Sequence, residues 1–255
     1  MPGWSKSNQH PAWKTARPAS SSRRVEDFLT LKKLAETERC FGENLQTTTY
    51  DMTIISKPLY LNNCDSRSTM RFEELGRHLA VASEKEAIAL VQADRKFWNV
   101  VSIHAPNISR VHLRGAKRVH YVAFDDAERI EGNEQEFFRL ATMEDLRSIF
   151  AFIDLQPSEP LLVHCQAGVS RSAAVALAMI VRSLRPRHLY GDAALIERAV
   201  ELLLTIRPSA RPNALVLRLG LEHFLSPPEA IFLLQGLLNH PQLLFNRFNG
   251  RVTHR

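Results

Sequence analysis

A cysteine and an arginine with five residues between them, Cys165 and Arg171, lie in the stretch LLVHCQAGVSRS at 161–172. The apolar residues at its start predict a short buried strand, and the apolar run after Ser172 predicts a helix. The loop between them can turn its backbone N–H groups inward, and the positive end of the helix dipole points into the same space. This order of strand, tight loop and helix predicts an anion-binding site with a thiol at its entrance.

The residue types in this loop favour phosphate as the anion. Arg171 has a planar guanidinium that can bind two phosphate oxygens, and Gly168 supplies the backbone freedom that a sharp turn needs. Because positive potential converges on Cys165, we expect its thiol to ionise readily and to act as a nucleophile. A thiolate below a bound phosphate is suited to phosphoryl transfer. A buried structural cysteine is the competing interpretation, but it leaves the rest of the pattern unexplained.

The pattern His164-Cys165-x5-Arg171-Ser172 resembles the signature of the cysteine-dependent protein tyrosine phosphatases. The fuller form HCQAGVSRS is most similar to their dual-specificity branch and its compact bacterial relatives. The resemblance implies a dual-specificity phosphatase-like fold and a reaction through a cysteinyl-phosphate formed by Cys165. Arg171 and the loop amides would bind the phosphate, so we expect no metal and no other cofactor.

The other residues of the signature have supporting roles in this interpretation. We expect Ser172 to donate a hydrogen bond to the cysteine sulfur, His164 to fix the loop as a structural hydrogen-bonding group, and Ser170 to brace it. Relatives that act on lipids carry lysines inside the loop, whereas the variable positions here are neutral. This favours a phosphoprotein or a small aryl phosphate as the substrate. The predicted substrate-binding residues are Gln166, Ala167, Gly168, Val169, Ser170 and Arg171.

A general acid is needed to protonate the leaving oxygen, and Asp125 and Asp126 follow the predicted strand HYVAF at 120–124. The resembled family keeps an aspartate on a loop after a strand, some tens of residues before the cysteine. Asp126 matches that place best, and Asp125 is the alternative. The competing interpretation is a solvated acidic turn in DDAERIEG. The tryptophan-containing acid loop of the larger tyrosine phosphatases is absent, which again favours the dual-specificity side.

Strands that alternate with helices must position these groups. Further strands are predicted at 79–82 and 98–103, and Ser83 with Glu86 forms a capping box for a helix to Gln92. We therefore expect an α/β fold with a central mixed or mainly parallel sheet flanked by helices. In such sheets ligands bind at the carboxyl ends of the strands, where Cys165 lies.

Helices dominate the second half of the predicted fold. An amphipathic helix is predicted at 134–155, with Phe138 and Leu140 in the core, and a buried helix at 172–184. Asp192 is the predicted N-cap of a helix at 193–206. The sequence PSARPN, which also resembles bacterial members of the family, is adequately explained as a helix stop and restart. A last helix is predicted from Ser226-Pro227-Pro228 to Leu238, followed by a frayed basic end at 245–255.

Composition sets the domain boundaries. The chain has 255 residues, is 45% hydrophobic, carries three cysteines and has a net charge of +6. We predict a flexible basic N-terminal extension at 1–50, a catalytic domain at 51–225, and a C-terminal helix and tail at 226–255. A transit peptide, or a true start at Met52, are alternatives for the first segment. A short helix is predicted within 25–43, strands at 54–55 and 59–61, and Cys40 and Cys64 are not expected to be metal ligands.

These observations predict a phosphoprotein phosphatase, specific for tyrosine or of dual specificity. The alternatives are a phosphate-binding module that has lost turnover, a phosphatase of a non-protein ester, and sulfur or arsenate chemistry on a similar loop. The few cysteines favour a reducing compartment, so we expect a cytoplasmic protein. No membrane span and no nucleic-acid partner are expected, because no apolar run is long enough and the basic residues are not clustered. The oligomeric state stays open.

Overall fold

The computed structural model describes residues 71–129, 138–187 and 191–252. The predictions for residues 1–70, including the extension, its helix, the strands at 54–55 and 59–61, and Cys40 and Cys64, lie outside these ranges.

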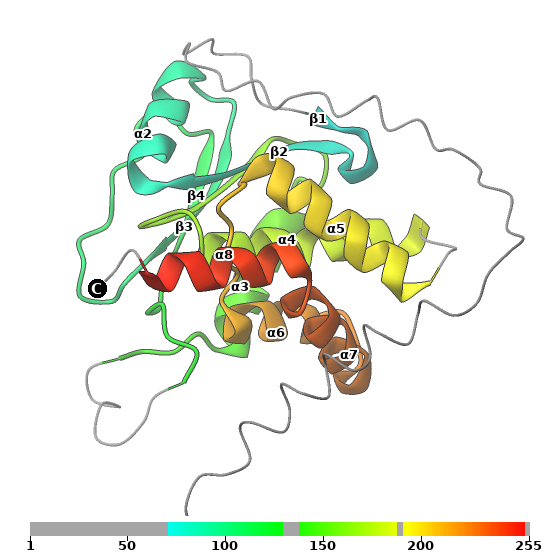
Figure 1. Cartoon of the computed structure of the whole chain (residues 1–255). Coiled ribbons are helices and arrows are strands. Elements are labelled where there is room, and N and C mark those ends of the chain that lie inside the picture. Colours follow the sequence, from blue (N-terminus) through cyan, green and yellow to red (C-terminus); the bar gives the residue numbers. More distant parts are fainter. Residues whose placement is uncertain (1–70, 130–137, 188–190, 253–255) are drawn as a thin grey trace, which may run out of the picture. The chain divides into compact units, whose positions relative to one another are not determined.

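A five-stranded sheet forms the centre of the described fold (Figure 1). Its order is β1-β2-β5-β3-β4, and every neighbouring pair is parallel except β1 with β2. The pairing of Ser83 with Cys165 and of Ser102 with His164 aligns the carboxyl ends of these strands at one edge. The strands are β1 (Arg71–Phe72), β2 (Arg77–Ser83), β3 (Asn99–His104), β4 (Arg118–Ala123) and β5 (Leu161–Cys165).

The described ranges contain seven α-helices, of which α2 to α5 pack on the sheet and the others mainly on helices. Strand β5 alternates between two hydrophobic clusters: Leu161 and Val163 face the larger one and Leu162 the smaller one, as the period of a strand requires. Helix α2 packs in the smaller cluster, and α3 to α8 contribute to the larger one. The helices are α2 (Glu84–Ala93), α3 (Met143–Asp154), α4 (Arg171–Leu184), α5 (Asp192–Ile206), α6 (Ala214–Glu222), α7 (Pro227–Leu238) and α8 (Pro241–Val252), with short 3-10 turns at Glu73–Leu75 and Arg185–Arg187.

The predicted fold class is confirmed: the sheet is mixed, mainly parallel, and has helices on both faces. The capping box of Ser83 and Glu86 at α2 is also confirmed. None of the described helices is both long enough and apolar enough to span a bilayer.

The predicted helix at 134–155 is wrong in its first half as far as the structure describes it. Residues 138–142 are not helical, and α3 begins at Met143 because Thr142 and Asp145 form a capping box. Asp125 exchanges two hydrogen bonds with the backbone of Arg139, which holds the chain extended before the cap. Phe138 is 45% exposed and therefore does not belong to the core.

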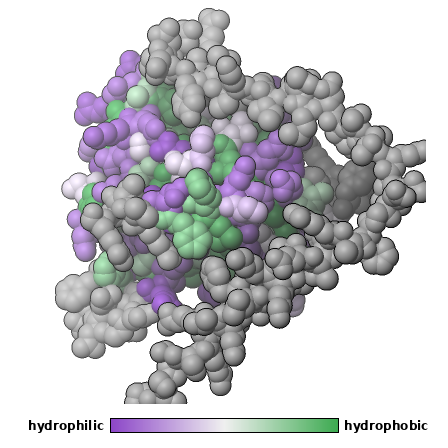
Figure 2. Space-filling model, viewed as in Figure 1, coloured by the Kyte–Doolittle hydropathy of each residue, from purple (hydrophilic) through white to green (hydrophobic). Residues whose placement is uncertain are grey.

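The C-terminal prediction is also wrong, because α7 is followed by another helix, α8. Leu243 of α8 is fully buried in the larger cluster, so packing stabilises a helix that continues into the end predicted to be frayed. Phe245 and Phe248 remain exposed on α8. On the face that carries α8 in Figure 1, hydrophobic residues gather near the centre, bordered by hydrophilic ones (Figure 2). A smaller correction concerns Asp192, which is the first residue of α5, while Gly191 is its N-cap.

Candidate active site

The loop at 165–171 joins the end of β5 to the start of α4, as predicted. The Cys165 side chain is almost fully buried, and its Sγ accepts a hydrogen bond from the N–H of Gly168 at 3.3 Å. The Ser172 Oγ lies 3.2 Å from the same sulfur. The sulfur therefore lies within hydrogen-bond distance of one backbone N–H and one hydroxyl group.

The loop turns sharply at Gly168, which has φ = +72°. A Cβ at this position would collide with the backbone of Ala82 and Ser83. Only glycine satisfies both the left-handed conformation and this close approach to the end of β2.

The carbonyl groups of the loop are bonded to its surroundings. The carbonyls of Gln166, Ala167 and Val169 accept from Glu84 N, Arg207 Nη2 and Arg211 N at 3.3, 3.2 and 2.7 Å. Apart from that of Gly168, no backbone N–H from 166 to 171 donates a hydrogen bond within the described part of the chain. These N–H groups and the N-terminus of α4 are thus available to an anion above the cysteine.

The Arg171 guanidinium lies buried between this loop and the segment that follows β4. Its Nη1 donates to the carbonyl of Phe124 at 2.8 Å, while its Nε has no hydrogen-bond partner among the described residues. An N–H group buried without a partner is costly, and a bound oxyanion would satisfy it.

Asp126 and Asp125 point to different partners. Asp126 Oδ1 accepts from Ser170 Oγ at 2.7 Å and from Asn213 Nδ2 at 3.0 Å, and its Oδ2 lies 3.9 Å from Arg171 Nε. Asp125 Oδ2 instead accepts from the Arg139 N–H at 2.8 Å. Of the two, the structure brings only Asp126 to the phosphate loop. After the roles predicted for them, we call residues 165–171 the phosphate loop and residues 124–129 the acid loop.

His164 is buried, and neither of its ring nitrogens has a hydrogen-bond partner among the described residues. The role expected for His164 in fixing the loop stays a prediction, and the backbone of Cys165 is the group that interacts with its ring. Burial lowers the pKa of His164 to about 4, so the ring is neutral at neutral pH.

Because burial lowers the pKa of His164, we expect the folded protein to lose stability in acid. Its pKa is about 4 when folded and 6.5 in the unfolded reference, so the unfolded chain binds the proton first and stability falls as pH falls through that interval. The 2.5-unit difference corresponds to about 3 kcal/mol of unfolding free energy by pH 4. Denaturant unfolding of the parent and of His164→Gln between pH 7 and 4 measures it. Identical pH dependence in the two proteins would contradict this role.

Asn213 contributes to the site, although the sequence did not predict it as a site residue. Asn213 caps α6 through Oδ1, which accepts from Val216 N at 3.0 Å, and its amide also donates to Asp126. The PSARPN segment thus does more than stop and restart a helix. Its resemblance to family members was the available signal, but the contact with Asp126 spans 87 positions in sequence.

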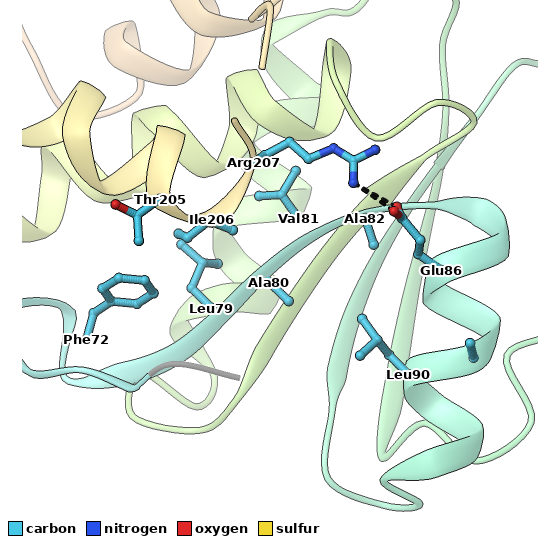
Figure 3. A pocket seen from close by; sticks show the side chains of 11 residues that line it. Phe72, Leu79, Ala80, Val81, Ala82, Glu86, Leu90, Thr205, Ile206 and Arg207 are labelled. Carbon is cyan, nitrogen blue, oxygen red and sulfur yellow. Dashed lines mark hydrogen bonds and ion pairs between the residues drawn. The ribbon is translucent and has the colours of Figure 1, made fainter. Parts of the chain in front are cut away.

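An ion pair between Arg207 and Glu86 contacts the phosphate loop through the carbonyl of Ala167. Arg207 Nη1 lies 2.9 Å from both carboxylate oxygens of Glu86, and its Nη2 donates to the carbonyl of Ala167. Although burial acts to raise the pKa of Glu86, hydrogen bonds from Ser83 and Arg207 hold it below its usual value. The pair borders a pocket of ≈ 370 Å³ between β2, α2 and the end of α5, with apolar walls that include Leu79 (Figure 3).

A second cavity, of ≈ 390 Å³, adjoins the phosphate loop, and its lining includes Asp126, Ser170, Asn213 and Arg247. Within the described ranges, no cluster of three or more His, Cys, Asp or Glu side chains could hold a metal ion.

Part of the chain is similar in sequence to a curated protein. Dual specificity protein phosphatase 12 of Mus musculus is 42% identical over 65 residues, which are 25% of this chain and 17% of that protein. Over a quarter of its length the chain is therefore similar to a dual-specificity phosphatase, in agreement with the resemblance predicted from the loop signature. No family model matches the chain. The match spans less than a fifth of the relative's length.

Similar solved structures include the human tyrosine phosphatase-like serine/threonine/tyrosine-interacting protein. It is 22% identical with a TM-score of 0.38, over 60% of this chain and 87% of that chain. The Yvh1 phosphatase domain from Chaetomium thermophilum is 20% identical with a TM-score of 0.40, over 58% and 89%. A mouse putative dual specificity phosphatase, solved with zinc tungstate, is 19% identical with a TM-score of 0.37, over 62% and 87%.

Proposed function

We propose that this protein hydrolyses phosphate monoesters of proteins through a cysteinyl-phosphate intermediate. One observation carries the proposal: the Cys165 sulfur lies below backbone N–H groups that have no protein partner, with Arg171 and Asp126 beside them. A phosphate fits this arrangement because its oxygens accept from the amides and from the guanidinium, while the sulfur approaches phosphorus.

In the first step, the thiolate of Cys165 attacks phosphorus. The S–P bond forms as the P–O bond to the leaving group breaks, and the leaving oxygen takes the proton of the Asp126 carboxyl. The equatorial oxygens stay bound to the loop amides and Arg171 throughout.

In the second step, water attacks phosphorus of the intermediate. The Asp126 carboxylate removes a proton from this water, the S–P bond breaks, and inorganic phosphate leaves. Ser172 then donates to the sulfur as it regains its negative charge, which the distance of 3.2 Å supports.

The substrate class follows from the same loop. Its variable positions, Gln166, Ala167, Val169 and Ser170, carry no charge, which favours a phosphoprotein over a lipid headgroup. The name of the curated relative agrees with dual specificity. A cytoplasmic location and a catalytic domain at 51–225 remain predictions.

Replacing the proposed acid tests this function. In Asp126→Asn we expect kcat for phenyl phosphate to fall on the order of 10²–10⁴-fold, because no proton reaches the leaving oxygen. The matched control is Asp125→Asn, which should keep nearly the parent rate since that carboxylate contacts the Arg139 backbone. Steady-state hydrolysis of phenyl phosphate measures both. A parent without turnover would overturn the enzyme proposal in favour of a phosphate-binding module, and a greater loss in Asp125→Asn would reassign the acid.

A further inference from the structure

Helix α8 reaches the segment that joins α5 to α6. Asn246 Nδ2 donates to the carbonyls of Pro208 and Ala210 at 2.8 and 3.0 Å, and Arg247 Nη2 donates to the carbonyl of Pro212 at 2.8 Å. Three carbonyls of one segment are thus held by two neighbouring side chains of α8.

Arg247 also reaches the acid loop. Its Nη2 lies 3.2 Å from Glu128 Oε1, and the same oxygen accepts the N–H of Ala214 at 2.7 Å. Glu128, two residues after Asp126, is therefore held both by α8 and by the first N–H of α6, where the helix dipole favours a carboxylate.

The two groups that Arg247 contacts, the Pro212 carbonyl and the Glu128 carboxylate, are both close in sequence to the proposed acid or to its partner. Pro212 precedes Asn213, whose amide donates to Asp126 Oδ1 at 3.0 Å, and Glu128 belongs to the acid loop itself. One guanidinium thus connects the two chain segments that set the position of the Asp126 carboxyl.

We propose that Arg247 is a positioning residue through which α8 holds the acid loop over the phosphate loop. This inference rests on the proposed function, because it assigns a role in delivering the proton of Asp126. Arg247 does not touch the phosphate loop in the hydrogen bonds of the described residues, so it acts through Glu128 and Asn213.

Substrates with different leaving groups can show whether Arg247 positions the acid or only supports the fold. Phenolate is a poor leaving group and needs the proton in the transition state, whereas p-nitrophenolate leaves with little help. Misplacing the acid by a fraction of an ångström should therefore slow phenyl phosphate much more than p-nitrophenyl phosphate. Damage to the phosphate loop would slow both equally.

The experiment compares the full-length parent with Arg247→Ala and Arg247→Lys on both substrates. For Arg247→Ala we expect kcat for phenyl phosphate to fall on the order of 10-fold, with a much smaller change for p-nitrophenyl phosphate and an unchanged KM. Arg247→Lys should recover part of the loss because it keeps the charge beside Glu128. The control is Arg185→Ala, which removes another arginine–carboxylate pair, with Glu229 at 2.7 Å, at the far end of α4 from the loop.

Two outcomes overturn the inference for an active parent: equal losses on both substrates, or the same losses in Arg185→Ala. If the parent hydrolyses neither ester, the proposed function fails and hydrogen exchange decides the inference alone. We then expect faster amide exchange over residues 124–129 in Arg247→Ala than in the parent. Equal exchange rates would show that α8 does not hold the acid loop.

Discussion

Serine in place of Cys165 is expected to lower aryl phosphate hydrolysis by roughly 10⁴-fold or more, a loss typical of removing a nucleophile. A hydroxyl stays protonated where a thiol ionises, so the attacking group is lost. The serine oxygen can still accept from Gly168 N and contact Ser172 Oγ, so the loop should keep its shape. Steady-state rates with p-nitrophenyl phosphate measure the effect.

Anion binding is the control for this variant. The loop amides and Arg171 are untouched in Cys165→Ser, so inorganic phosphate should bind with nearly the parent affinity in a calorimetric titration. Parent-like turnover in Cys165→Ser would mean that another group attacks phosphorus and would refute the proposed mechanism. Loss of phosphate binding together with turnover would mean that the sulfur supports the loop itself.

Alanine in place of Gly168 is expected to abolish activity and to lower the free energy of unfolding by about 3–5 kcal/mol. The cost combines a left-handed backbone with a methyl group driven into the backbone of Ala82 and Ser83. Relief of this collision must move the loop, which removes the Gly168 N–H from the Cys165 sulfur. Denaturant unfolding and the rate with p-nitrophenyl phosphate report the two losses.

The control variant Gly76→Ala separates the cost of the left-handed backbone from the cost of the steric collision at Gly168. Gly76 also has a positive φ, of 65°, but no atom lies within 4 Å of the position of an added Cβ. Its alanine variant should lose only about 1 kcal/mol, the cost of the left-handed conformation, and keep full activity. If both variants lose the same stability, the packing of the loop against β2 is looser than the structure indicates.

Local sequence determined the phosphate loop and the elements beside it. The strand before Cys165, the turn at Gly168 and the helix after Arg171 follow from neighbouring residues, as does the capping box of Ser83 and Glu86. Strand alternation and helix periodicity were sufficient for the mixed α/β fold, since burial on each face repeats within a few residues.

Tertiary structure decided the rest of the candidate site. Asp125 and Asp126 are adjacent and identical in type, so the sequence favoured Asp126 only through a resemblance. Contacts with Arg139 on one side and with Ser170 and Asn213 on the other distinguish them physically. The end at 245–255 was predicted to be basic and frayed because the stability of helix α8 depends on burying Leu243 in a core built from distant strands and helices. Hydrogen bonds and packing between residues many tens of positions apart have no local pattern in the sequence, and they appear only once the chain is folded.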